Sequence, residues 1–569
     1  MWGNEFGGYN LVQKIRLMAL GGLDEDGKNM YLVEIDGDIF VVDCGLKYPS
    51  ESEQLGIEYI IPDFTYLKEH ESRIKGIFIS HGHDDVMSAF GHLIKEIDAD
   101  VYATALTAKL LNDEIEKHHI KNKRINVIKR HDVIKIGNHT IRTFPVMQSI
   151  ADGVGFAFET EYGSIVYTSE FIFDYDFLNN AFSMDINALS EIGKNKVLCL
   201  MSESTGALRS GYTAPKHRIT DHIEHYFEVS DNRLIITLYR QNLFRIMEIL
   251  ELASKYKKKV FFYDNEHIRL LKFVEELGYF KVPRDVLVTE NDFNNDMKDV
   301  VCIISGGGNQ VFRLMNNITI GEDSKIELCE SDTVIIASPV VPGTENDATA
   351  MENDLYKAGV NIVKLNAKEI LSMHASIEDL KMMLYLTSPR YYLPIKGQYS
   401  DLVNNADIAV DMGFTADKII ILDNGQFASF ENGRLSSTSE TIELNDTAID
   451  STSMKDVSGM VLKDREALST DGAIIAGVVL DFATKKVIGG PDVQSRGVIY
   501  LKDADNILNE IGDILVKTIE ENVKNGSYNN MQIRAEVREK VSRYVLKETG
   551  KKPMILPAIV EINMGEESA

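Results

Sequence analysis

Apolar residues fall into short runs separated by amphipathic, helix-period stretches along the first two hundred residues. Two apolar runs, 31–35 and 39–42, flank the turn residues Asp36-Gly37-Asp38 and predict a β-hairpin. The same periodicity predicts three further elements in order: a strand at 74–79, a helix at 107–118 and a strand at 164–167. This region is therefore expected to form an α/β core.

A second block with its own strand–helix rhythm lies between residues 206 and 369. The elements that it predicts are strand 234–239, helix 241–256, strand 259–263, helix 266–277, strand 300–305 and strand 333–336. Because parallel strands need crossover connections, which helices supply, this alternation indicates a largely parallel sheet covered by helices.

The last quarter of the chain opens with a polar segment. Residues 435–458 are rich in Ser, Thr, Asp and Glu and poor in apolar residues, which predicts a linker. Beyond it the pattern predicts strands at 473–480 and 497–501, helices at about 504–523 and 529–548, and a last strand at 558–562. Residues 459–569 are thus expected to form a small α+β domain.

Composition and length narrow the class of protein. The 569 residues are 44% hydrophobic and 26% charged, typical of globular proteins and too many for one core. No apolar run is long enough for a bilayer, and residues 1–10 lack the zones of a secretory signal. Four widely spaced cysteines without a CxxC pair suit a reducing compartment. We expect a cytoplasmic protein that does not bind membranes.

The formal charge of −27 argues against a protein that coats nucleic acid by bulk attraction. It does not exclude RNA bound in a local positive channel, because net charge says little about a single groove.

The segment after the strand at 74–79 carries the clearest chemistry. Ser80 is followed by His81, His83 and Asp85 in the spacing HxHxD, just where a helix pattern begins. Imidazole nitrogens and a carboxylate oxygen suit a divalent metal. Two nearby histidines more often lie on the surface without binding a ligand. Here their place between a strand and a helix indicates descent from a metal site.

Several ordered motifs carry a resemblance to a known family. They are GGLDEDGKNM (21–30), DCGLKYP (43–49), SESTGA (202–207), PGTE (342–345), HAS (374–376), PIKGQY (394–399) and GGPD to RG (489–497). With HxHxD they resemble the metallo-β-lactamase superfamily, more closely its β-CASP branch, which acts on nucleic acids, and most closely the bacterial ribonuclease J family. The likeness covers nearly the whole chain.

The resemblance implies a fold and a domain order. It implies a metallo-β-lactamase αββα sandwich (1–205 and 370–434) with an inserted α/β β-CASP domain (206–369). A linker (435–458) and a small C-terminal α+β domain (459–569) follow; in the family, that last domain contributes to assembly.

The departures from the family pattern fall on its metal ligands. The family normally binds two zinc or manganese ions, and its signature HxHxDH ends in a histidine where this chain has Val86. Gln148 and Lys396 also align with ligand histidines, and Glu170 aligns with the bridging aspartate. An apolar side chain, a neutral amide and a cation are poor replacements for imidazoles. We therefore expect metal-dependent hydrolysis to be weak or absent.

Two interpretations of the altered site stay open. In the first, no metal binds, and the ammonium of Lys396 takes a metal's place and neutralises Asp85 and Glu170, since buried carboxylates without a cation are costly. In the second, His81, His83, Asp85 and Glu170 hold a single divalent ion weakly, manganese or zinc, with Asp85 and Glu170 as residual catalytic groups.

The resemblance also implies residues that hold RNA phosphates. Ser372, His374 and Ser376 are candidates, because hydroxyls and imidazole can hold a phosphate. Ser305 opens the run SGGGNQ after a strand, whose backbone N–H groups could meet a phosphate; a plain strand-to-helix turn is the alternative. Glu203 stands where the family has a supporting aspartate.

For function, the resemblance implies a degenerate ribonuclease J paralogue, like the second one found beside an intact one in many Gram-positive bacteria. We expect a largely non-catalytic subunit that binds single-stranded RNA and an intact ribonuclease J, as a homo- or hetero-oligomer (dimer or tetramer), in mRNA decay and rRNA maturation. The alternative is a slow manganese-dependent 5′-to-3′ exoribonuclease, with endonuclease activity as a variant of it. A metal-free RNA-binding or scaffold protein without that partner is the third interpretation.

Overall fold

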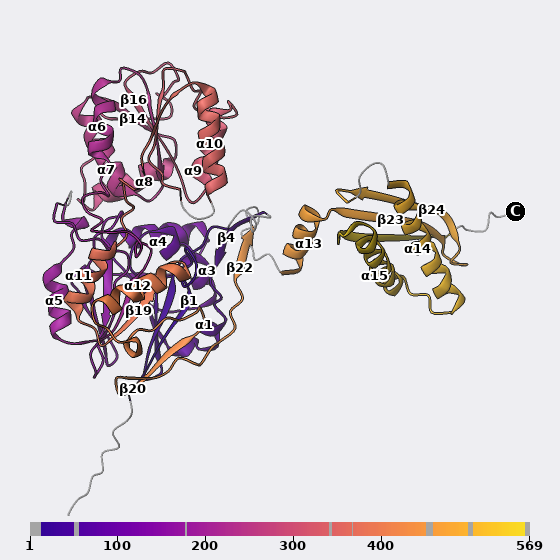
Figure 1. Cartoon of the computed structure of the whole chain (residues 1–569), viewed down its shortest axis with the longest axis horizontal. Coiled ribbons are helices and arrows are strands. Elements are labelled where there is room, and N and C mark those ends of the chain that lie inside the picture. Colours follow the sequence, from indigo (N-terminus) through magenta and orange to yellow (C-terminus); the bar gives the residue numbers. More distant parts are fainter. Residues whose placement is uncertain are drawn as a thin grey trace, which may run out of the picture. The chain divides into compact units, whose positions relative to one another are not determined.

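The computed structural model describes residues 13–49, 56–176, 179–340, 344–366, 368–450, 459–498 and 504–563 (Figure 1). The chain divides into two compact units, one of Met1–Glu51 and Glu58–Thr447, the other of Ser52–Ile57 and Ala448–Ala569. Within the described part, no helix combines the length and apolarity needed to cross a bilayer.

The first sheet of the larger unit leads into the HxHxD segment. In the described part of the chain its order is β21-β20-β1-β2-β3-β5-β6-β7. β2 and β3 form the predicted antiparallel hairpin, and β3, β5, β6 and β7 run parallel. The bounds are β1 Lys14–Gly21, β2 Met30–Ile35, β3 Asp38–Val42, β5 Ile74–Ile79, β6 Val101–Ala103, β7 Ile125–Val127, β20 Phe427–Glu431 and β21 Arg434–Ser437.

The second sheet packs against the first through an apolar layer. Its order is β19-β12-β11-β10-β9-β8, and β11, β12 and β19 are parallel neighbours. Phe40 and Phe78 of the first sheet pack with Phe156 and Phe158 of the second. The bounds are β8 Val133–Ile136, β9 His139–Pro145, β10 Val154–Phe158, β11 Ser164–Tyr167, β12 Val197–Glu203 and β19 Tyr391–Ile395.

Helices accompany both sheets. α5, α11 and α12 bury apolar residues against the outer face of the second sheet, while α4 packs on α3 and contacts β6 and β7. The predicted helix at 107–118 is α4, which begins slightly earlier. The bounds are α1 Thr65–Glu69, η2 Glu71–Arg73, α2 Asp84–Met87, α3 Phe90–Glu96, α4 Ala105–Lys117, η3 Asn180–Phe182, α5 Ile186–Lys194, α11 Ile377–Thr387, α12 Tyr399–Asp411 and η4 Ala416–Lys418.

Between β12 and β19 the chain forms an inserted domain around one parallel sheet, in the order β15-β14-β16-β13-β17-β18. α6, α7 and α8 cover one face and α9 and α10 the other (Figure 1). The segments that enter and leave the inserted domain are neighbours, because Gly206 pairs with Ser376 in a β-bridge. The bounds are α6 Thr220–Val229, β13 Leu234–Tyr239, α7 Leu243–Lys255, β14 Lys259–Phe262, α8 Asn265–Glu276, β15 Leu287–Val288, β16 Val300–Gly306, α9 Gln310–Thr319, β17 Thr333–Ile336, α10 Glu345–Ala358 and β18 Asn361–Lys364.

The smaller unit has a three-stranded sheet, β24-β23-β25, and two long helices. Alternate residues of β23 are buried in a core shared with α14 and α15. β24 was not predicted as a strand, because its Gly489-Gly490-Pro491 run breaks the apolar pattern. The strand predicted at 497–501 lies mostly outside the described residues. The bounds are α13 Gly459–Thr470, β23 Ala473–Asp481, β24 Val487–Arg496, α14 Ala504–Lys524, α15 Asn530–Thr549 and β25 Met554–Ile562.

The predicted domain boundaries remain predictions, although two observations bear on the proposed linker, 435–458. Its first residues belong to β21, which pairs with β20 at the edge of the first sheet. β22 (Thr447–Asp450) lies further on, and 451–458 are outside the described residues, as are Pro342 and Gly343 of the PGTE motif. The remaining short strand is β4 (Ile57–Ile61).

We predict that Arg233 is essential to the stability of the inserted domain. The buried Arg233 guanidinium binds the buried Asp332 carboxylate through Nε at 3.1 Å and Nη2 at 2.6 Å. Arg233→Met leaves that carboxylate without its cation and should cost about 3–5 kcal/mol of unfolding free energy, measured by urea denaturation followed by circular dichroism. Lys357→Met, which removes the pair of a well-exposed lysine with Asp354 in the same domain, is the control and should cost less than about 1 kcal/mol. Equal losses in both variants would contradict the prediction.

Candidate metal centre and phosphate site

The candidate ligands lie on loops that follow the ends of strands. β5 ends one residue before Ser80, and His83 precedes the first turn of α2, which contains Asp85. Glu170 follows β11, and Lys396 follows β19 with a left-handed φ of 55°. The parallel arrangement of β11, β12 and β19 brings the last two loops to one edge of the sheet.

A close approach of backbone fixes the HxHxD loop. A Cβ atom on Gly45 would lie 1.6 Å from the carbonyl oxygen of Asp85, so only glycine lets the segment after β3 pass there. The amide N–H groups of Cys44 and Leu46 donate to the carbonyl oxygens of Val86 and Asp84, at 2.7 and 3.0 Å. The DCGLKYP motif therefore holds α2 in place.

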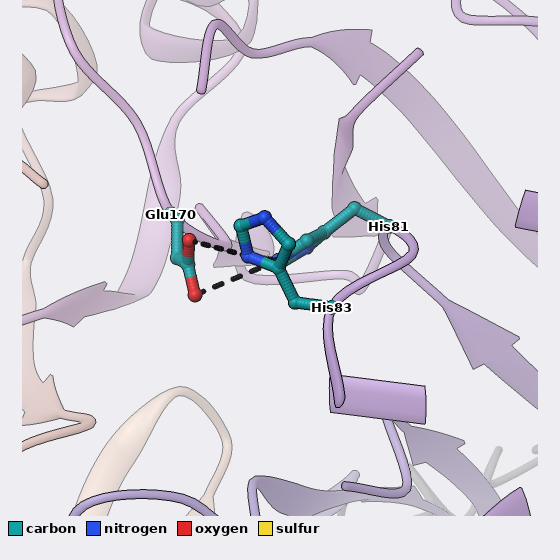
Figure 2. A group of neighbouring side chains, drawn as sticks. All are labelled: His81, His83 and Glu170. Carbon is teal, nitrogen blue, oxygen red and sulfur yellow. Dashed lines mark hydrogen bonds and ion pairs between the residues drawn. The ribbon is translucent and has the colours of Figure 1, made fainter. Parts of the chain in front are cut away.

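His81, His83 and Glu170 form the group that could hold an ion. Their ligand atoms all lie within 4.8 Å of one another, and Figure 2 shows both imidazoles beside the carboxylate. His83 Nδ1 is 3.1 Å from Glu170 Oε2, and His81 Nε2 is 3.5 Å from Oε1 and 3.1 Å from His83 Nδ1. Two nitrogens and a carboxylate oxygen are a donor set that zinc or manganese accepts.

Lys396 makes the contact predicted for it. Its Nζ donates to Asp85 Oδ2 at 2.6 Å and also to Glu170 Oε1. The Lys396 side chain is 7% exposed. Asp85 Oδ2 accepts a further hydrogen bond from Asn29 Nδ2 at 3.0 Å. Asp85 is thus engaged by a cation and an amide and lies outside the group of His81, His83 and Glu170.

Electrostatic interactions favour the ionised forms of Lys396, Glu170 and Asp85. Burial acts to lower the pKa of Lys396, but the carboxylates of Asp85 and Glu170 outweigh it and hold that pKa well above its ordinary value. Burial acts to raise the pKa of Glu170, yet Lys396 and the two imidazoles hold it well below the ordinary value. The pKa of Asp85 is lowered for the same reason, with Lys396 opposing burial. Burial lowers the pKa of His81 to about 4, so its ring is neutral at pH 7.

Two other positions from the family pattern offer little to an ion. Val86 is 1% exposed and has no lone pair, and Gln148 is 0% exposed. Neither the oxygen nor the nitrogen of the Gln148 side-chain amide has a hydrogen-bond partner among the described residues. A buried amide without partners carries a desolvation cost that an imidazole bound to a metal would not.

These contacts test how well the residues fit divalent ions. One ion could use the lone pairs of His81, His83 and Glu170. A second group of three ligands does not exist among the described residues. Lys396 places a positive charge against Glu170, which opposes even the first ion. The described residues therefore do not fit a pair of ions.

The predicted phosphate residues differ in what they can reach. His374 Nδ1 lies 2.8 Å from Glu203 Oε2, and the His374 side chain is 21% exposed. Burial acts to lower the pKa of His374, but Glu203 outweighs it and raises the pKa. Ser372 Oγ accepts a hydrogen bond from Arg209 Nη1 at 2.8 Å. Ser376 is 0% exposed and caps α11, so its hydroxyl does not face solvent.

Ser305 is also engaged within the fold. It lies in β16, is 3% exposed, and its Oγ is 3.2 Å from His267 Nδ1. The glycines that follow pass close to Tyr48, since a Cβ on Gly307 would lie 2.3 Å from its hydroxyl oxygen. This favours the turn interpretation of SGGGNQ over a phosphate loop.

Sequence reasoning missed the residues that orient the group. Asn29 binds Asp85, Ser149 Oγ lies 2.9 Å from His83 Nε2, and Ser80 and Ser169 Oγ atoms lie within 3.0 Å of His81 Nδ1. Asp43 accepts from the Ser80 amide at 2.7 Å, and burial raises the pKa of Asp43 to about 7. Asn29 lies in the GGLDEDGKNM motif and Asp43 in the DCGLKYP motif, so their likeness to the family pattern could have indicated them.

Three family models match the chain. They are the metallo-beta-lactamase superfamily at residues 23–182, the ribonuclease J beta-CASP domain at 231–355 and the ribonuclease J C-terminal domain at 460–562. Ribonuclease J 2 of Staphylococcus epidermidis is 33% identical over 550 residues, 96% of this chain and 98% of that protein. Ribonuclease J 2 of Staphylococcus aureus is 32% identical over the same shares.

The chain belongs to the ribonuclease J family.

Family membership confirms the predicted fold class, an α/β protein with metallo-β-lactamase, β-CASP and C-terminal domains. The ribonuclease J family acts on RNA, and the metallo-β-lactamase superfamily implies divalent metal binding. A crystal structure of a protein of unknown function from Enterococcus faecalis aligns with a TM-score of 0.51 at 15% identity, over 73% of this chain and 100% of that one. This likeness shows the fold alone.

Removing the Lys396 ammonium should destabilise the ribonuclease J core. Lys396→Met leaves two neighbouring carboxylates without their cation, which we expect to cost about 3 kcal/mol of unfolding free energy at neutral pH, in urea with a metal chelator present. Lys68→Met, which removes an exposed pair with Glu96, is the matched control and should cost less than about 0.5 kcal/mol. If both variants unfold at the same urea concentration, the ammonium has no such role.

The effect of Lys396→Met should depend on pH. The folded pKa values of Glu170 and Asp85 lie below their ordinary 4.5 and 3.8, so their contribution is present above these values and is lost as pH falls. The folded pKa of Lys396 lies above 10.5, so its contribution is present below that value and is lost at higher pH. The free-energy difference between wild type and variant should therefore be largest between about pH 5 and pH 10 and shrink towards pH 3. A difference that grows as pH falls would contradict this assignment.

Proposed function

We propose that this chain is a largely non-catalytic, RNA-binding subunit of a ribonuclease J complex that takes part in mRNA decay and rRNA maturation. The observation that carries the proposal is the position of the Lys396 ammonium, bonded to both Asp85 and Glu170. In a two-metal hydrolase, divalent ions neutralise such carboxylates and activate the attacking water. A lysine neutralises carboxylates but supplies neither Lewis acidity nor an activated water.

The substitutions at Val86 and Gln148 support the same conclusion. A valine side chain and a buried amide without partners stand where the family pattern has imidazoles. A phosphodiester bound here would meet bulk water without charge stabilisation, so most of the rate enhancement of an intact site should be absent.

The proposed partners are single-stranded RNA and a catalytically intact ribonuclease J. The relatives carry the name Ribonuclease J 2, and residues 460–562 match the family's C-terminal domain. We propose that this domain joins the chain to the intact paralogue in a hetero-oligomer. His374 and Ser372 are the residues proposed to meet an RNA phosphate, while Ser376 caps α11 next to them.

One observation favours a second function, a weak manganese-dependent 5′-to-3′ exoribonuclease. His81, His83 and Glu170 still place three ligand atoms within 4.8 Å of one another. In that case Glu170 and Asp85 would be the residual acidic groups, and displacement of Lys396 from Glu170 would have to accompany metal binding.

Elemental analysis and RNA turnover separate the two functions. The full chain is dialysed against manganese or zinc, and decay of a 5′-monophosphorylated RNA is followed in the same samples. We expect fewer than about 0.2 tightly bound ions per chain and no turnover. Close to one or two ions with steady decay would favour the exoribonuclease and contradict the proposal.

Restoring the family ligands provides the matched control. The triple variant Val86→His, Gln148→His, Lys396→His regains three imidazoles and loses the ammonium, so its metal content should rise well above that of the wild type.

A separate experiment tests the proposed partner. An intact ribonuclease J is mixed with the wild-type chain, and the complex is sized by light scattering. Failure of the two proteins to associate would remove the proposed partner.

A further inference from the structure

The carboxylate of Asp379, 0% exposed in the first turn of α11, ties together three loops near His374. Its oxygens accept hydrogen bonds from the backbone amides of Phe173 at 3.1 Å, Thr213 at 2.9 Å and Ser376 at 3.0 Å. These amides belong to the segment after Glu170, to the loop that enters the inserted domain and to the start of α11. A buried carboxylate with three N–H donors fixes these backbones relative to one another.

Two of the loops carry exposed aromatic rings. Tyr175, two residues beyond Phe173, is 72% exposed, and Tyr212, next to Thr213, is 42% exposed. Arg218 Nη2 also holds the segment of Tyr175, by a 2.9 Å bond to Asp174 Oδ2. The rings therefore face solvent from backbones that are held in place. An exposed tyrosine alone needs no explanation, but two on braced, neighbouring loops suggest a shared ligand.

The entry loop also carries a cation. The carbonyl oxygen of Arg209 accepts from the Ile377 amide at 3.0 Å, so this loop runs along the start of α11. The Arg209 guanidinium binds Ser372 Oγ, and it makes no ion pair with a carboxylate of the described residues. Thr213 Oγ1 donates to the His374 carbonyl oxygen at 2.6 Å. Tyr212 thus lies one residue from a direct contact with a proposed phosphate residue.

Exposed aromatic rings together with an arginine nearby in the chain are a common surface for single-stranded nucleic acid. Bases stack on the rings whatever their identity, and the cation offsets a backbone phosphate. Asp174 and Asp176 share the guanidinium of Arg218, which leaves one net negative charge beside Tyr175, so a strand would present its neutral bases to this ring rather than its backbone.

We propose that Tyr175 and Tyr212 form a base-stacking surface that holds single-stranded RNA next to the His374 site, where the Arg209 guanidinium neutralises the charge of a phosphate. The proposal rests on the RNA binding proposed above and adds the residues that would carry it. It requires no metal and no catalysis, because stacking and charge supply the affinity.

The test is a binding titration of the full chain with a short 5′-monophosphorylated RNA labelled with 2-aminopurine, whose fluorescence falls when the base stacks. Tyr175→Ala and Tyr212→Ala should each weaken binding about tenfold and reduce the quenching. Tyr175→Phe and Tyr212→Phe keep the ring and should stay within about twofold of wild type. Tyr385→Ala, which removes a tyrosine 73% exposed near the end of α11, is the matched control and should leave binding unchanged.

The outcomes separate this inference from the function on which it rests. Wild-type affinity and quenching in both alanine variants would overturn the stacking surface while leaving RNA binding by the chain intact. No binding by the wild type would overturn both proposals. If the alanine variants bind RNA normally but lose association with an intact ribonuclease J, the two rings contact protein, and the inference is wrong.

Discussion

The ammonium of Lys396 lies where three segments of the core, distant in sequence, meet. It comes from the end of β19 and bonds to Asp85 in α2 and to Glu170 after β11. Two neighbouring carboxylates in a buried setting repel each other unless a cation lies between them. Glu170 in turn contacts both His81 and His83, so the orientation of the imidazoles depends on the same ammonium. The Lys396 ammonium thus keeps the carboxylates and imidazoles of this group together.

Much of this core could be predicted from the sequence. The hairpin of β2 and β3, the strand β5 and the parallel strands of the inserted domain follow from apolar periods, which respond to burial on one or two faces. The Lys396 contact was predictable too. A buried lysine needs carboxylate partners, and the family pattern places the carboxylates of Asp85 and Glu170 close to this position. β24 was missed, since its glycines and proline carry no strand period and its place is set by pairing with β23.

Other features depend on three-dimensional detail that no residue pattern records. Asp85 was expected either to share an ion with the histidines or to be neutralised by Lys396; the structure shows the Lys396 bond and adds a hydrogen bond from Asn29 that was not predicted. Ser376 was a candidate for phosphate, but its hydroxyl is used as a helix cap and lies 2.7 Å from Thr213 Oγ1. A serine before a helix can cap or bind a ligand, and only the positions of its neighbours decide between the two. The three backbone hydrogen bonds of Asp379 could not be predicted either, because they depend on the positions of neighbouring loops.

The place of the inserted domain has an evolutionary consequence. β12 and β19 are hydrogen-bonded neighbours, and Gly206 pairs with Ser376 where the insertion begins and ends. The pairing of β12 with β19 therefore uses no residue of the inserted domain. An ancestral gene could gain such a domain in a single recombination event without refolding its core. The inserted domain could then diversify independently of the sandwich that supports it.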